Sequence, residues 1–74
     1  EVGEIEAGFE SLRARATEAG ALGEVAWCWE QEGLVRRHLD DHEGACRCFQ
    51  AGLTLARKMG YELFARRCEE ALRS

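Results

Sequence analysis

The chain of 74 residues is predicted to be all-α, with about four antiparallel helices arranged as helix-turn-helix units. Three observations indicate this fold class. Apolar residues recur at the 3.6-residue spacing of amphipathic helices along most of the chain. No proline interrupts the pattern, and Gly20 and Gly60 follow periodic stretches at positions where the left-handed conformation can end a helix. Only a few residues connect the periodic stretches, so consecutive helices should run antiparallel.

The first two helices are expected at residues 3–19 and 22–39. The first has one narrow apolar stripe with charged residues around it, so it should pack against one side only. That stripe consists of Val2, Ile5, Phe9, Leu12, Ala16 and Ala19. The second begins after Gly20 and has a wider apolar arc, which should be buried. The arc contains Leu22, Val25, Ala26, Cys28, Trp29, Gly33, Val35 and Leu39.

The third and fourth helices are expected at residues 42–59 and 61–73. Asp40 is predicted to cap the third helix, and Glu43, three residues later, can reach back to complete a capping box. Apolar residues, including Phe49, cover about half of this helix, so it should lie between two neighbours. The fourth helix follows Gly60 and has a single apolar side that contains Phe64.

The sequence also repeats itself at an offset of 40 residues, so the first helix corresponds to the third and the second to the fourth. An internal period of this length indicates stacked units rather than one closed globule. The identical pairs are Phe9 and Phe49, Ala16 and Ala56, Gly20 and Gly60, and Cys28 and Cys68.

Composition and charge argue against several classes of partner. The 14 acidic residues outnumber the 10 basic ones, and the arginines are spread along the chain, so nucleic acid is an unexpected partner. No apolar run approaches the roughly 20 residues that cross a bilayer, and no signal peptide is evident. We therefore expect a soluble protein in the cytoplasm. The chain begins with Glu1, and it is interpreted as a segment of a longer protein.

No pattern of residues indicates catalysis, a metal or a cofactor. Cys46 and Cys48 project about 200° apart around a helix and cannot chelate one ion together. His38 and His42 flank a turn beside two aspartates, an arrangement that helix capping explains. No glycine-rich phosphate loop is present. We expect four reduced, unliganded thiols, no cofactor and no enzymatic activity.

Trp29 and Gly33 form a W-x₃-G motif, and Ala45 and Phe49 form A-x₃-F, with twelve residues from the glycine to the alanine. Leu55, Ala56, Arg57 and Gly60 then form an L-A-R-x-x-G stretch. In these motifs the chain resembles a tetratricopeptide repeat array, in the roughly 40-residue variant of Pins-type adaptor scaffolds. The resemblance covers one full repeat, about residues 22–60, with one flanking helix on each side. It implies an α-solenoid segment that binds a protein partner.

Glu32 and Arg36 depart from the family pattern, because both stand inside the apolar arc of the second helix. A lone buried charge would cost several kcal/mol, and these residues are one turn apart. One interpretation is therefore a partly buried ion pair. The alternative is that this part of the arc faces solvent.

Trp27 and Leu34 lie seven residues apart on the opposite side of the same helix, about 150° from the centre of the buried arc. In tetratricopeptide arrays the inner face of each first helix lines a concave groove that receives a peptide or helix. The resemblance therefore assigns six residues to a partner-binding groove, namely Trp27, Glu30, Gln31, Leu34, Arg37 and His38.

Two alternatives to the groove remain open at this point. Trp27 can instead pack against a preceding helix in a tightly wound stack. In the corresponding functional alternative, the segment has no ligand groove and stacks within a larger assembly or self-associates through its repeats.

Overall fold

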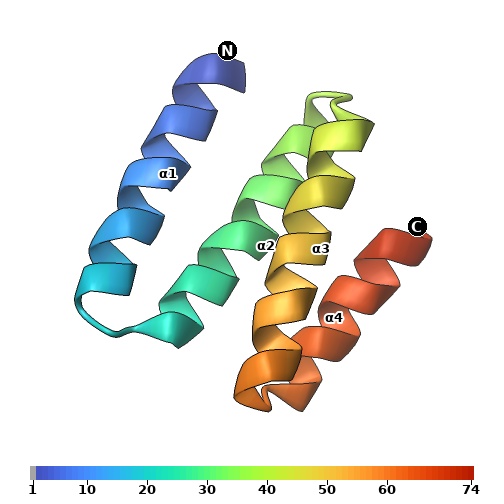
Figure 1. The fold of residues 1–74 in the computed structure, drawn as a ribbon. Coiled ribbons are helices and arrows are strands. Elements are labelled where there is room, and N and C mark those ends of the chain that lie inside the picture. The colour runs from blue at the N-terminus through green and yellow to red at the C-terminus, as the bar shows by residue number, and fades with distance from the viewer. Residues whose placement is uncertain (1) are drawn as a thin grey trace.

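The computed structural model describes residues 2–74, which fold into four helices and contain no strand. The helices are α1 (Val2–Glu18), α2 (Leu22–His38), α3 (His42–Met59) and α4 (Glu62–Arg73). Figure 1 shows that they run up and down in chain order, each antiparallel to the next. The predicted all-α class and antiparallel order are therefore confirmed, and the predicted helix bounds agree to within one residue. None of the helices in this part of the chain is long and apolar enough to cross a membrane.

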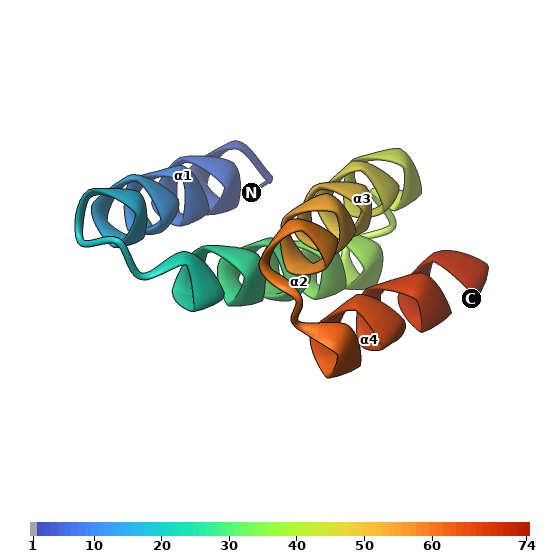
Figure 2. The same cartoon turned by 60° about the horizontal axis from the view of Figure 1, so that its bottom comes forward.

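The four helices form two thin layers. Viewed nearly end-on, α1 and α3 lie in one layer, and α2 and α4 lie in the other (Figure 2). Helix α2 contacts both α1 and α3, and α3 contacts both α2 and α4. The Cα atoms extend 30 × 28 × 12 Å along the principal axes, so the molecule is a slab with little depth. Its core is consequently concentrated around the two central helices, α2 and α3.

Each of the three turns between consecutive helices contains a residue in the left-handed conformation. Gly20 and Gly60 have φ angles of 74° and 77°, as the sequence predicts, and Asp40 takes the same role between α2 and α3 with φ of 66°. In each turn, the amide of the residue that follows the left-handed one donates to a carbonyl in the last turn of the preceding helix at 2.8 Å. These amide-to-carbonyl pairs are Ala21 to Ala16, Asp41 to Arg36, and Tyr61 to Ala56.

The predicted cap of α3 is wrong by one residue. Asp41, rather than Asp40, caps the helix, and its Oδ1 accepts a hydrogen bond of 3.1 Å from the Gly44 amide. Asp40 cannot take this position because its backbone is already in the left-handed conformation that ends α2. The residue three positions after the cap is then Gly44 instead of Glu43, so the predicted capping box does not form.

The tightest packing lies between α2 and α3. Phe49 is only 1% exposed, and its ring lies directly on Gly33. A Cβ atom added at Gly33 would come within 2.7 Å of the Phe49 ring, which is closer than real Cβ atoms approach a neighbour. Gly52 of α3 likewise faces Trp29 of α2 at close range. These two glycines let α2 and α3 approach closely enough to bury Phe49.

Candidate protein-binding surface

Helix α2 has neighbours on three of its sides, and the fourth side carries large apolar residues. Trp27 is 49% exposed and Leu34 is 40% exposed, and His38 also lies at the surface. Trp27 and Leu34 are two helical turns apart, so they follow one line along α2. The structure therefore brings three of the six residues predicted to bind a partner together on a side of α2 that no described helix covers.

A hollow of about 470 Å³ adjoins this uncovered side of α2, between α2 and α1. Its lining residues are Leu12, Ala16, Glu24, Trp27 and Cys28. Leu12 was assigned to the core from its place in the stripe of the first helix, but it is 44% exposed and faces the hollow. Sequence periodicity could place Leu12 on the apolar stripe, but it could not tell how much of that stripe α2 covers.

Glu30 lies on the side of α2 that faces α4, and it is only 6% exposed. Arg67 of α4 donates two hydrogen bonds to its carboxylate, from Nε to Oε2 at 3.0 Å and from Nη2 to Oε1 at 2.5 Å. This bidentate geometry is the strong form of an arginine–carboxylate pair. Glu30 is therefore engaged in holding α4 against α2, and its carboxylate is not free on the open surface.

Arg37 also reaches towards α4. Its Nη1 donates a hydrogen bond of 3.1 Å to the backbone carbonyl of Ala71, and its guanidinium carbon lies 5.2 Å from the centre of the Phe49 ring. The carbonyl belongs to the last turn of α4, and it also accepts a hydrogen bond of 3.3 Å from the Ser74 amide. Glu30 and Arg37 thus fasten α4 beside α2, and Gln31 is half-buried.

The predicted ion pair between Glu32 and Arg36 is confirmed. Arg36 Nε donates to Glu32 Oε2 at 2.8 Å, and the two side chains are 8% and 2% exposed. Arg36 also pairs through Nη1 with Asp41 at 2.6 Å and through Nη2 with Glu6 of α1 at 3.4 Å. The alternative, in which this part of the arc faces solvent, is wrong.

A second arginine, which the sequence pattern does not predict, completes this buried cluster. Arg13 of α1 donates a hydrogen bond to the other oxygen of the Glu32 carboxylate. Its guanidinium carbon also lies 3.6 Å from the centre of the Trp29 ring, within the range of a cation–π contact. Glu32 therefore joins α1 and α2 through a charge that is satisfied on both oxygens. We call Arg13, Glu32, Arg36 and Asp41 the buried ion cluster.

The cluster shifts the pKa of two residues, Arg36 and Asp41. Burial alone would lower the pKa of Arg36, but the hydrogen bonds to Glu32 and Asp41 outweigh burial and raise it. The hydrogen bond from Arg36, with help from the Gly44 amide, lowers the pKa of Asp41. Both shifts favour the charged forms, so the cluster is stable as an ionic unit at neutral pH.

All four cysteines are free thiols in the structure. Burial, followed by the neighbouring Glu32 carboxylate, raises the pKa of Cys48 to about 11, so its thiol stays protonated at neutral pH. Cys46 lies at the surface. Within residues 2–74 no three His, Cys, Asp or Glu side chains come together in a way that could hold a metal ion.

The candidate site is thus an uncovered side of α2, with Trp27, Leu34 and His38 at the surface. The buried ion cluster joins this helix to α1, and the bridges from Glu30 and Arg37 join it to α4. No protein-family model matches the chain, and no match was found among curated proteins or solved structures.

Proposed function

We propose that the chain is a protein–protein interaction module of an intracellular scaffold or adaptor, which binds a peptide or helix along the uncovered side of α2. The observation that carries this proposal is the exposure of Trp27 and Leu34 on one line of a helix that is otherwise surrounded. Exposed apolar patches often mark interaction sites, and tryptophan is the residue type most enriched among binding hot spots.

The matching turns support a tetratricopeptide-like arrangement as the frame of this surface. The turns after α1 and α3 both place glycine at a φ near 75° and use the same 2.8 Å backbone hydrogen bond. These turns are 40 residues apart, at the offset that the sequence repeats. In such an array, α2 and α4 would be the inner helices, and a bound segment would lie across both.

The contacts made by Glu30 and Arg37 give them a supporting role in the proposed module. They hold α4 at a fixed position beside α2, so that the surface made by these two helices is formed before a partner binds. Preorganisation of this kind reduces the entropy lost on binding. Trp27 and Leu34 would supply the apolar anchor, and Glu24 and His38 would supply polar contacts on the same side.

A displayed library of random peptides provides a direct test. We expect wild-type protein to enrich peptides whose binding falls by at least about fivefold in Trp27→Ala and Leu34→Ala, since a truncated anchor costs roughly 1 to 4 kcal/mol. Met59→Ala is the matched control, because Met59 is 38% exposed and lies on α3, outside the proposed surface of α2 and α4. The melting temperature of Trp27→Ala should stay close to that of the wild type. The proposal fails if the enriched peptides bind Trp27→Ala as well as they bind the wild type.

A further inference from the structure

Helix α1 has an apolar face that no described helix covers. Ile5, Gly8, Phe9 and Leu12 line a shallow hollow of about 270 Å³ on this face. A Cβ atom added at Gly8 would have no atom within 4 Å, so the hollow is open to solvent there. Phe49, which stands at the corresponding place on α3, is buried because α2 packs over it. The face of α1 is therefore built for packing, and none of the helices within residues 2–74 packs on it.

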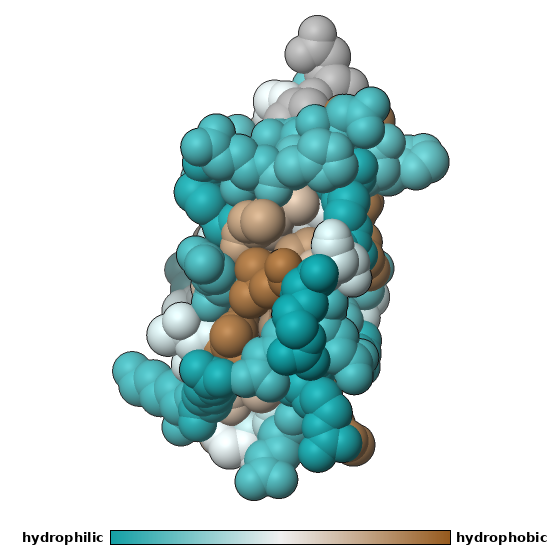
Figure 3. Space-filling model, turned by 90° about the vertical axis from the view of Figure 1, so that its right-hand side faces the viewer, coloured by the Kyte–Doolittle hydropathy of each residue, from teal (hydrophilic) through white to brown (hydrophobic). Residues whose placement is uncertain are grey.

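In a head-to-tail stack, a second copy would place its α4 side on the apolar face of α1. Figure 3 faces the α4 side and shows mainly hydrophilic side chains around a narrow apolar strip. Four charged residues of α4 belong to no ion pair within residues 2–74, namely Glu62, Arg66, Glu70 and Arg73. Burying unpaired charges against the apolar face of α1 would cost several kcal/mol each. The charged residues of α4 are Glu62, Arg66, Arg67, Glu69, Glu70 and Arg73.

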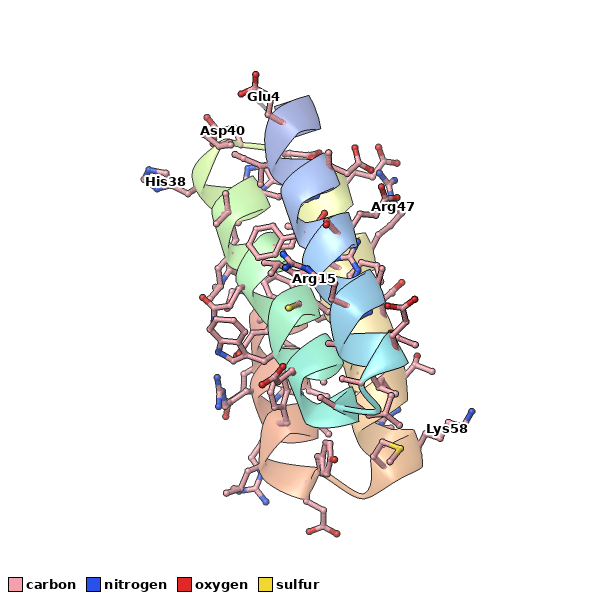
Figure 4. All side chains as sticks on the ribbon, turned by 90° about the vertical axis from the view of Figure 1, so that its left-hand side faces the viewer. Glu4, Arg15, His38, Asp40, Arg47 and Lys58 are labelled. Atoms are coloured by element: carbon pink, nitrogen blue, oxygen red, sulfur yellow. The ribbon has the colours of Figure 1, made fainter. Side chains whose placement is uncertain are left out.

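A second copy of α1 can cover this apolar face and also offers charges opposite to those along its edge. Glu4 and Arg15 are both exposed, and within residues 2–74 neither belongs to an ion pair. They are eleven residues apart, about three helical turns, so they lie along one edge of the apolar face near opposite ends of α1. Figure 4 labels both residues on this helix.

We propose that the apolar face of α1 is a homodimer interface, in which two copies of α1 pair antiparallel about a twofold axis. When two copies of Val2–Glu18 overlap fully, Glu4 of each copy comes within one residue of Arg15 of the other. A twofold axis of this kind keeps the two edges on the same side, so both Glu4–Arg15 pairs form.

The same register places apolar groups against apolar groups. Leu12 of one copy lies opposite Gly8 of the other, where the hollow has room for a leucine side chain. The antiparallel arrangement also sets the helix dipoles in their favourable orientation. Because each copy has one such face, the assembly closes as a dimer and does not grow further. Leu12 also lines the hollow beside Trp27, but Glu4 and Arg15 line neither hollow, so changing these two charges tests the dimer separately from peptide binding.

Charge reversal tests this interface directly by analytical ultracentrifugation over a roughly hundredfold concentration range. Wild-type protein should show a monomer–dimer equilibrium. Arg15→Glu places two acidic groups together at each end of the interface, and Glu4→Arg places two basic groups there. Each variant alone should dimerise about tenfold more weakly than the wild type, because like charges at an interface repel. An equimolar mixture of the two variants should form a 1:1 heterodimer with restored affinity.

The mixture separates pairing from damage to the helix, since a frayed α1 would not be rescued by a second variant. Both residues are exposed, so circular dichroism of the separate variants should match that of the wild type. The proposal is overturned if the wild type stays monomeric over the whole range, if it assembles beyond a dimer, or if the mixture binds no better than the variants alone.

Discussion

Removing Arg36 is the sharpest test of the buried ion cluster. Arg36→Met keeps an unbranched side chain of similar length but leaves Glu32, which is 2% exposed, with Arg13 as its only charged partner. Loss of one partner from a buried pair costs about 3 to 5 kcal/mol when the remaining charge has no other partner. Because Arg13 remains, we expect a loss of about 2 to 3 kcal/mol in the free energy of unfolding. The exposed partner Glu6 should add little to this.

That loss is large for a chain of this size. A domain of 74 residues has roughly 4 to 11 kcal/mol of total stability. The melting temperature should therefore fall by about 10 to 20 °C. Urea unfolding, followed by helical circular dichroism, measures the free energy directly.

The matched control is Arg57→Met, which removes an exposed pair with Glu69 and should cost less than about 1 kcal/mol. The triple variant Arg13→Met, Glu32→Leu and Arg36→Met should be more stable than Arg36→Met alone, because it removes Glu32 together with both arginines that pair with it and leaves neither charge short of a partner. If Arg36→Met unfolds at the same urea concentration as Arg57→Met, the cluster does not contribute as the structure indicates.

Three further predictions concern single positions. Gly33→Ala should lower the melting temperature, although alanine normally stabilises a helix by about 1 kcal/mol over glycine, because its Cβ would press on the Phe49 ring at 2.7 Å; an unchanged or higher value would contradict this packing. With a thiol reagent at neutral pH, Cys46 should react quickly, and Cys48, buried and with its pKa raised to about 11, should react only after unfolding. The pKa of Asp41 is lowered in the folded state, so its contribution to stability is present above the ordinary value of 3.8 and is lost as pH falls through the lower, folded value. Acid unfolding of Asp41→Asn should therefore depend less on pH in that range, and an identical acid profile would show that the interaction with Arg36 does not affect stability.

Helix positions could be predicted from the sequence because their causes are local. The left-handed ends at Gly20 and Gly60 need only a residue without a Cβ atom, and the apolar period is visible within each helix. Asp40 and Asp41 mark the limit of this reasoning, since two adjacent aspartates can both cap a helix. The turn decides between them: Asp40 takes the left-handed position that ends α2, so Asp41 becomes the cap, and Arg36 bonds its second oxygen.

Contacts between helices were harder to predict. The pairing of Glu32 with Arg36 followed from their spacing of one turn, but Arg13 stands 19 residues from Glu32 in the chain. Glu30 was predicted to line the groove, yet Arg67 reaches it from α4, 37 residues later. A helical wheel gives the direction of a side chain on its own helix. It does not give the length or position of a side chain that arrives from another helix.

The thin slab formed by the four helices has a consequence for the order in which they assemble. Helix contacts are made chiefly between neighbours in the sequence, so closing each contact requires only a short loop. Proteins dominated by such local contacts fold quickly, and domains generally begin to fold from the N-terminal end during synthesis. In this chain α1 and α2 can join through Arg13 and Glu32 before α4 has been made. Helix α4 is then added last, onto a surface that α2 and α3 have already formed.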